Sequence, residues 1–351
     1  MDYRKEIDEL VDMMIKEDAS DLHLSVGRTP IIRVSGSLIP LMKKPVITEN
    51  DMRGYIDVFI PTAKELLTPM KDVDFSYNSA NARFRGNVFH RQGTPAIALR
   101  LIPKTIRTLA ELHLPPILES FTRKSQGFFL VVGPIGQGKT TTLTTLIEMI
   151  NQTRTEHILT IEDPIEYLFE SKKSIIDQRE VRIDTPDFAD ALKAMFREDI
   201  DVCMVGEMRD TDTISTAVTA AETGHLVFST LHTNNAAQTI DRIIDSFPST
   251  QQDQIRVQLA GSLSGIFSQR LIPSVSGGLV PAYELLINNY AVANLIRERR
   301  SHEINTVIET SSQQGMIDLN RSLAELVRSG QITVENAYAY SMNPKTLERL
   351  I

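Results

Sequence analysis

A glycine-rich segment offers the most specific chemistry in this sequence. It runs Gly133-Pro134-Ile135-Gly136-Gln137-Gly138-Lys139-Thr140 and fits the phosphate-loop pattern G-x-x-x-x-G-K-[ST]. Glycines allow backbone N–H groups to converge on phosphate oxygens, and a helix N-terminus adds partial positive charge there. We expect Lys139 to reach the β- and γ-phosphates and the Thr140 hydroxyl to bind Mg²⁺. The predicted nucleotide-binding residues extend through this whole segment to Thr141.

Carboxylates follow two apolar runs that read as strands. The run at 201–205 leads to Glu207, a Walker-B-like position at which we expect the carboxylate to bind Mg²⁺ through water. The run at 157–161 leads into Glu162 and Asp163. We expect Glu162 to polarise an attacking water and Asp163 to orient the site as a further metal ligand. A carboxylate that caps a strand end, or a solvated acidic turn, is the alternative.

Two histidines bracket a further apolar run. His225 precedes the run at 226–230 and His232 follows it. Seven extended residues span roughly 23 Å, so the two imidazoles are not expected to share one site unless the chain turns. We expect one to contact the γ-phosphate and the other a neighbouring subunit. A histidine that serves only as a polar cap is the alternative at each position.

Arginines gather in the N-terminal part of the chain. Arg83 and Arg85 share one face of a predicted strand, about 7 Å apart, and Arg100 lies in a neighbouring predicted strand. Arginines outside the domain that carries the phosphate loop can reach a phosphate in another subunit, as arginine fingers do. A solvated strand face is the alternative reading.

The elements before residue 104 indicate a small α+β domain. Residues 3–17 place apolar side chains at helical spacing, and residues 50–69 also read as a helix. Strands are expected at 19–24, 31–34, 38–39, 75–77, 83–89 and 96–102. We predict an N-terminal domain over 1–103 and a proline-interrupted linker over 104–116.

From residue 117 the pattern changes to short apolar runs separated by helix-length segments. The runs at 128–132, 157–161, 201–205 and 226–230 are mainly apolar, as in strands buried on both faces. Their alternation with helices indicates a parallel sheet. We therefore predict an α/β domain over 117–351 whose last part is mainly helical.

Length, composition and charge exclude several classes of protein. A chain of 351 residues suggests about two domains, and 42% apolar with 23% charged residues excludes wholesale disorder. No apolar run approaches the roughly 18 residues of a membrane span, and the first residues lack the apolar core of a secretion signal, so the cytoplasm is the expected compartment. The single cysteine excludes an internal disulfide or a multi-cysteine zinc site. A net charge of −8 argues against nucleic acid as a partner.

These motifs together resemble one family, the bacterial secretion-type hexameric ATPases, and within it the branch that retracts type IV pili. The resemblance covers almost the whole chain. It is carried by residues 19–24, 30–36, the arginine strand at 83–89, the acidic "Asp box" at 162–166, the segments at 178–181 and 206–210, and the "His box" at 221–232.

The resemblance implies a PAS-like N-terminal domain, a RecA-like P-loop ATPase domain with a helical C-terminal part, and assembly into a homohexameric ring. ATP and Mg²⁺ would bind between the domains and at a subunit boundary, with Glu162 as catalytic glutamate and Glu207 as the Walker B acid. Arg83, Arg85 and Arg100 would be the candidate arginines of the first domain. No Asn-Lys-x-Asp motif for guanine is present, which favours ATP.

The resemblance to motors that retract pili also implies which proteins this chain would bind. The motor would power twitching motility by depolymerising the pilus at its inner-membrane base, through a platform protein in that membrane. It would be peripheral to the membrane through its partners alone, at the inner face of the cytoplasmic membrane, and a paralogous pilus ATPase is a further expected partner.

Departures from the family pattern keep alternatives open. Ile135 and Gln137 stand where the family commonly has Thr and Ser, and altered nucleotide affinity is expected. Residues 291–298 resemble the retraction motif A-I-R-N-L-I-R-E, but Ala293 replaces its first arginine. The alternatives are an accessory ring ATPase with weak hydrolysis or a pilus-extension or secretion ATPase. The absence of a tetracysteine motif disfavours the extension and secretion branches, and the net charge disfavours a DNA-handling motor.

Overall fold

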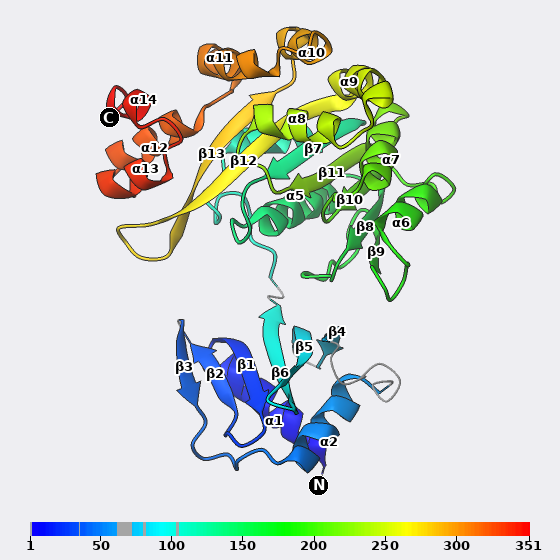
Figure 1. Ribbon diagram of the computed structural model, residues 1–351, viewed down its shortest axis with the longest axis vertical. Coiled ribbons are helices and arrows are strands. Elements are labelled where there is room, and N and C mark those ends of the chain that lie inside the picture. Colours follow the sequence, from blue (N-terminus) through cyan, green and yellow to red (C-terminus); the bar gives the residue numbers. More distant parts are fainter. Residues whose placement is uncertain (1, 35, 62–71, 80–81, 103–104) are drawn as a thin grey trace. The chain divides into compact units, whose positions relative to one another are not determined.

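The computed structural model describes residues 2–34, 36–61, 72–79, 82–102 and 105–351, and Figure 1 shows its helices and strands. Contacts divide the chain into two compact units, one of residues 1–105 with 164–168 and one of residues 106–163 with 169–351. The predicted domain bounds of 1–103, 104–116 and 117–351 stay a prediction. The boundary at residues 103 and 104 lies outside the described residues.

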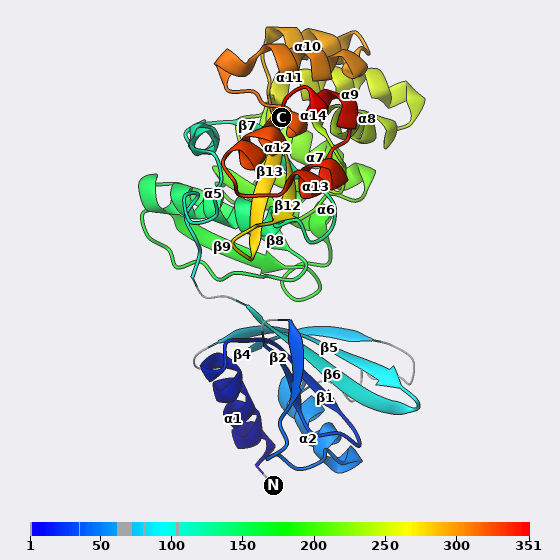
Figure 2. The same cartoon turned by 90° about the vertical axis from the view of Figure 1, so that its left-hand side faces the viewer.

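The first unit is an antiparallel sheet of six strands in the order β3-β2-β1-β6-β5-β4. Helices α1 (Tyr3–Lys16) and α2 (Glu49–Phe59) pack on one face of this sheet (Figure 2). The predicted second helix extended to residue 69, and its part at 62–69 lies outside the described residues. The strands are β1 (Ala19–Ser25), β2 (Ile31–Val34), β3 (Ser37–Pro40), β4 (Val73–Asn78), β5 (Arg83–Arg91) and β6 (Thr94–Ile102).

Apolar side chains at strand and helix periods form the core of the first unit. Ile7, Leu10 and Met14 recur on one face of α1, as the sequence predicts. They pack with Leu22 of β1 and Phe84 of β5. Because side chains alternate along a strand, the residues between these apolar ones face away from the helices.

The second unit is built on a sheet of seven strands in the order β13-β12-β7-β11-β10-β8-β9. The strands are parallel from β12 to β9, and β13 is antiparallel to β12. Their bounds are β7 (Gly127–Val132), β8 (His157–Glu162), β9 (Ile175–Glu180), β10 (Val202–Val205), β11 (Leu226–Leu231), β12 (Leu263–Pro273) and β13 (Leu279–Ile287). The predicted parallel sheet is confirmed, while β9, β12 and β13 are strands that the sequence did not indicate.

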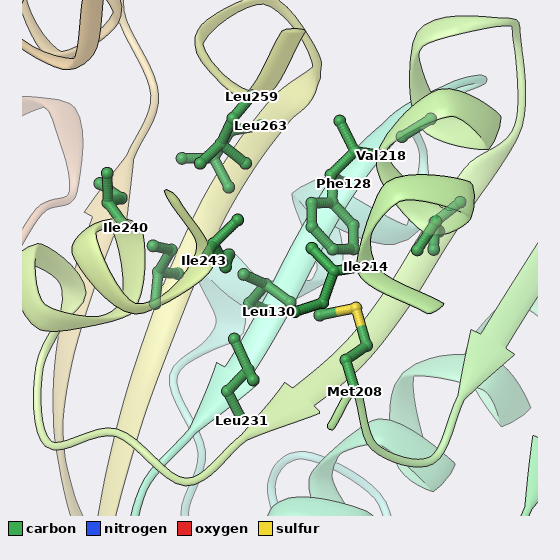
Figure 3. Packing of buried hydrophobic residues seen from close by; sticks show 14 of the residues in the cluster. Phe128, Leu130, Met208, Ile214, Val218, Leu231, Ile240, Ile243, Leu259 and Leu263 are labelled. Carbon is green, nitrogen blue, oxygen red and sulfur yellow. The ribbon is translucent and has the colours of Figure 1, made fainter. Parts of the chain in front are cut away.

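Helices cover both faces of this second sheet. Phe129 of β7 packs with α5, while Phe128 and Leu130 project toward Ile214 of α7 and Ile243 of α8 (Figure 3). The helices are α4 (Glu119–Thr122), α5 (Lys139–Thr153), α6 (Phe188–Met195), α7 (Thr211–Glu222), α8 (Ala236–Asp245), α9 (Ser249–Ser262), α10 (Tyr290–Arg297), α11 (Ile304–Thr310), α12 (Leu319–Arg328), α13 (Val334–Tyr340) and α14 (Pro344–Glu348), with short 3₁₀ turns η1 (Pro116–Leu118), η2 (Ser301–Glu303) and η3 (Ser312–Gln314). Burial on both faces explains why consecutive apolar residues, rather than an alternating apolar and polar pattern, occur in the central strands. Cys203 of β10 is one of these fully buried residues.

The C-terminal helices pack on the edge of the second sheet and include the helix that carries Ala293. Helices α12 to α14 pack on the outer parts of β12 and β13, through Leu323 and Leu347 against Ile272 and Val280. In α10, which carries the departure from the retraction motif, Ala293 is only 7% exposed. An arginine at this position would have to bend its side chain out of a packed face.

Across the part of the chain that the structure describes, no helix has the length and apolar character needed to cross a membrane.

Candidate nucleotide-binding site

The phosphate loop lies between the carboxyl end of β7 and the first turn of α5. Gly133, Gly136 and Gly138 have φ angles of +147°, +76° and +76°, a region that L side chains rarely adopt. A Cβ atom at Gly133 would also lie 2.5 Å from the Gln269 carbonyl oxygen. Gly138 is the N-cap of α5 and brings no side chain to its first N–H groups. The loop is therefore shaped to present backbone N–H groups to an anion.

Lys139 folds back over this loop. Its side chain is buried, and its Nζ donates to the carbonyl oxygens of Gly133 and Pro134, both at 2.8 Å. Burial lowers the pKa of Lys139 to about 8, although the nearby Glu207 carboxylate partly opposes this shift. A bound phosphate would favour the charged ammonium group, which is the form that contacts phosphate oxygens.

His232 joins Lys139 to Glu207. Its Nδ1 lies 3.2 Å from Lys139 Nζ, and its Nε2 lies 3.5 Å from Glu207 Oε2. The tautomer that suits both neighbours carries its proton on Nε2, so that Nδ1 accepts from the lysine. Glu207 Oε1 also pairs with Arg209 at 2.5 Å. Three predicted site residues from three separate segments thus meet beside the phosphate loop.

His225 lies elsewhere. It precedes β11, at the amino edge of the parallel strands, whereas the phosphate loop and His232 are at the carboxyl edge. Its Nδ1 is 3.0 Å from the Ala220 carbonyl oxygen, and its ring stacks edge-on against Phe196. The structure does not bring His225 together with the phosphate loop. The prediction that one of the two histidines contacts a neighbouring subunit stays a prediction.

The acidic turn after β8 supplies the remaining carboxylates. Glu162 is buried, and its Oε1 accepts hydrogen bonds from Thr160 Oγ1 at 2.7 Å and Gln178 Nε2 at 3.2 Å. The Gly206 N–H donates to the Ile161 carbonyl oxygen at 2.8 Å, which aligns the ends of β8 and β10.

The close approach of β8 and β10 explains why a glycine, Gly206, precedes the Walker-B-like Glu207. A Cβ atom there would lie 3.2 Å from the Ile161 carbonyl oxygen and 3.5 Å from Glu162 Cα. Glycine therefore allows the strand ends that carry Glu162 and Glu207 to approach closely. Asp163, the other predicted metal ligand, pairs with Arg182 at 3.2 Å.

The candidate arginines of the first unit lie together on one sheet face. Arg85 of β5 is directly opposite Arg100 of β6, and Arg83 is two residues before Arg85. The Arg100 side chain is 71% exposed and pairs with Asp21 at 2.9 Å, while Arg83 is nearly buried and donates to Asn78. This face is the one opposite α1 and α2, because the alternate residue Phe84 packs in the helix-side core.

Sequence reasoning missed two residues of β12 beside the loop. Gln269 contacts the phosphate loop, and the guanidinium of Arg270 donates to the Asn234 carbonyl and side-chain oxygens, both at 3.0 Å. Burial lowers the pKa of Arg270 from its ordinary value. No local pattern marks either residue, since their place at the loop depends on how β12 pairs with β7.

A cavity of about 350 Å³ adjoins the start of α5. Its volume is in the range of small-molecule sites, and apolar side chains line it together with polar groups. The lining residues are Arg107, Glu111, Leu112, His113, Leu114, Gly138, Thr141, Thr142, Gln269, Leu271, Gly278, Leu279 and Pro281. Because Gly138 and Thr141 border both the cavity and the loop, a ligand with its phosphates in the loop can place its organic part here.

Comparison with known proteins agrees with this geometry. The family model described as "Type II/IV secretion system protein" matches residues 3–303. The chain is similar to the type IV pilus retractation ATPase PilT of Pseudomonas aeruginosa, at 42% identity over 333 residues, 95% of this chain and 97% of that protein. It is also similar to a twitching motility protein of Neisseria gonorrhoeae, at 44% identity over 321 residues, 91% and 86% of the two chains.

A solved structure is similar over nearly the full length. It is the crystal structure of the pilus retraction motor PilT with bound ADP, with a TM-score of 0.91, 45% identity, and coverage of 97% of this chain and 98% of that chain. The expected α/β fold class, with a small sheet domain and a larger ATPase domain, is confirmed.

Proposed function

This chain belongs to the type II/IV secretion system protein family, and we propose that it is the ATP-hydrolysing motor that powers type IV pilus retraction and twitching motility. The observation that carries the proposal is the meeting of Lys139, His232 and Glu207 at a phosphate loop, in a chain similar over nearly its full length to a pilus retraction motor.

The roles of the site residues follow from their positions. Backbone N–H groups of residues 135–141 would hold the β- and γ-phosphates of ATP, and Lys139 would exchange its loop carbonyls for phosphate oxygens. Glu162 would orient the attacking water and accept its proton. Hydrogen bonds from Thr160 and Gln178 fix the direction of its carboxylate in advance.

Mg²⁺ suits the side chains present. This ion is commonly held by one or two carboxylates or hydroxyls together with substrate phosphates, and Thr140 and Glu207 offer such a set. Bound there, Mg²⁺ would neutralise charge on the phosphates. Asp163 stays a predicted ligand, but its ion pair with Arg182 must first be broken.

We further propose that the working form is a homohexameric ring. Arg83, Arg85 and Arg100 would then supply positive charge to a nucleotide held by another subunit. The ring would act on an inner-membrane platform protein at the inner face of the cytoplasmic membrane, beside a paralogous pilus ATPase. It would reach the membrane through its partners alone and bind no nucleic acid.

A second candidate, an accessory ring ATPase with weak hydrolysis, rests on Ala293 in α10. Pilus counts by electron microscopy, with twitching scored in a host that lacks the gene, separate the two functions. Abundant pili without twitching would support retraction. Absent pili would contradict it and indicate extension. Retained twitching, with negligible ATP hydrolysis by the purified protein, would favour the accessory role.

A further inference from the structure

Strand β12 extends past the strand with which it pairs. Its last pair with β7 joins Ser268 to Val132, the residue before the phosphate loop. Beyond this point β12 continues to Pro273, held on its other side by β13. The three residues that follow Ser268 therefore lie alongside the phosphate loop. A shorter β12 that ended together with β7 would not contact the loop.

One side chain of this extension spans the loop. Gln269 is 3% exposed, and its Nε2 donates to the Gln137 carbonyl oxygen at 2.8 Å. Its Oε1 accepts from Thr142 Oγ1, in the first turn of α5, at 2.7 Å. A carboxamide can donate to the first partner and accept from the second at the same time, because it carries an NH₂ group and a carbonyl oxygen.

The glycines at both ends of the loop approach the same residue. A Cβ atom at Gly138 would lie 3.0 Å from Gln269 Nε2, and one at Gly133 would lie 2.5 Å from the Gln269 carbonyl oxygen. The loop is thus fitted closely around Gln269, and its glycines serve this contact as well as phosphate approach.

A second attachment uses a position at which the loop departs from the family pattern. The Leu271 N–H donates to Gln137 Oε1 at 2.7 Å. A serine hydroxyl at residue 137 would be two bonds shorter than this amide and would not reach the same partner. Gln137 is therefore tied to β12 through both its backbone and its side chain.

These contacts fix the orientation of the peptide between Gln137 and Gly138, whose N–H group should face phosphate. In a planar trans peptide, the C=O and N–H groups point in opposite directions. When the Gln137 carbonyl is held toward Gln269, the Gly138 N–H of the same peptide must point away from β12. The opposite direction is the concave side of the loop, where backbone N–H groups bind phosphate oxygens.

We propose that Gln269 is a positioning residue of the nucleotide site, which fixes the Gln137–Gly138 peptide in the orientation that binds phosphate. This inference rests on the nucleotide site proposed above. Gln269 touches no reacting atom in this role. It reduces the reorganisation that the loop would otherwise undergo when nucleotide binds.

The test compares nucleotide affinity in the full-length protein and its Gln269→Met variant. Methionine has similar length but cannot donate to the Gln137 carbonyl. We expect the Kd for ADP and ATP, measured by calorimetry, to rise about tenfold, or about 1.4 kcal/mol. KM for ATP should rise in parallel while kcat changes less, because the peptide is fixed before chemistry begins.

Two further variants keep the test decisive. Gln269→Glu has the same shape but sets a carboxylate against the carbonyl, and it should weaken binding at least as much. The control Asn288→Leu removes an amide that donates to the Ala260 and Leu263 carbonyls at 3.1 and 2.8 Å, at the other end of β12. It should lower the melting temperature while nucleotide affinity is retained.

The outcomes separate this inference from the proposed function. Unchanged Kd in a folded Gln269→Met protein would overturn the positioning role, as would an equal loss of affinity in Asn288→Leu. If Lys139→Ala loses binding while Gln269→Met retains it, the positioning role alone is wrong. If Lys139→Ala also retains full affinity, the nucleotide site itself is wrong.

Discussion

The two sheets of this protein keep their charged side chains in different places. In the first unit, α1 and α2 pack on one face of an antiparallel sheet, and the opposite face carries Asp21, Arg85 and Arg100. In the second unit, helices cover both faces of a largely parallel sheet. The ionisable side chains of its candidate site gather instead where the strands end, as Lys139 and Glu207 do.

The difference teaches how burial decides where chemistry can occur. A sheet covered on one face offers a surface on which charges remain partly hydrated, so each arginine keeps an exposed or paired guanidinium. A sheet covered on both faces has only its edge left, where helix N-termini and strand ends converge. The first arrangement suits a contribution to another subunit, and the second suits a closed site for hydrolysis.

The largest effect should come from a carboxylate at the strand edge. Glu162→Gln keeps the size of the side chain but removes the charge that would accept a proton. We expect ATP turnover to fall about 100-fold or more, while ADP binds with nearly unchanged Kd. A phosphate-release assay and calorimetry measure the two quantities. Unchanged turnover would refute the role of Glu162.

The next effect tests the arginine face. Arg100→Ala should lower turnover at least about tenfold with little change in Kd, if arginine charge is supplied to another subunit. Arg33→Ala is the matched control, since Arg33 lies 3.7 Å from the same Asp21 carboxylate. It should retain turnover.

Mixed rings make this test specific for action between subunits. Arg100→Ala and Lys139→Ala proteins are each expected to be weakly active or inactive. When mixed, they should regain activity, because some boundaries would pair an intact loop with an intact arginine. Failure to regain activity in rings shown to exchange subunits would contradict the action of Arg100 in trans.

A smaller effect compares the two ends of one strand. His232→Gln removes the link between Lys139 and Glu207, and turnover should fall about tenfold. His225→Gln, at the amino end of β11, should change turnover by no more than about twofold in a ring that still assembles. Equal losses in assembled rings would show that the carboxyl edge is not the sole functional end of this strand.

The smallest effect is the pH dependence of nucleotide affinity. The pKa of Lys139 is lowered to about 8 by burial, and phosphate should raise it again. Affinity is then fully present below the lower pKa and is lost as pH rises toward the pKa of the complex. Calorimetry at about pH 9, in two buffers with different ionisation heats, should detect proton uptake on ADP binding. Heats that do not depend on the buffer would contradict this prediction.

Local sequence patterns predicted the strands that are buried on both faces and the phosphate loop. The mainly apolar runs of β7, β8, β10 and β11 indicated strands buried on both faces, and the structure confirms the parallel sheet. The glycine pattern predicted the phosphate loop, and the strand ends predicted Glu162 and Glu207 beside it. These signals depend only on residues close in sequence. In the structure, His232 lies between Glu207 and Lys139 of the loop.

The features that the sequence did not reveal depend on pairing between strands that are distant in the sequence. β12 carries Ser268, Gln269 and Arg270, three consecutive polar residues that interrupt any apolar run, and their side chains form hydrogen bonds to Asn234 and Gln137. β9 is an edge strand with few buried residues, so it lacks an apolar run. The Lys139–His232–Glu207 chain arises from strand order, which no local spacing encodes.

The reactivity of the buried Cys203 can report transient opening of the sheet in the second unit. It is the chain's single cysteine, it is fully buried in β10, and burial raises the pKa of its thiol to about 12. Alkylating reagents attack an accessible thiolate, so labelling must wait until this sheet transiently opens. The labelling rate in the unmodified protein therefore measures those openings directly. A nucleotide that binds the closed form should slow it in proportion to its own affinity.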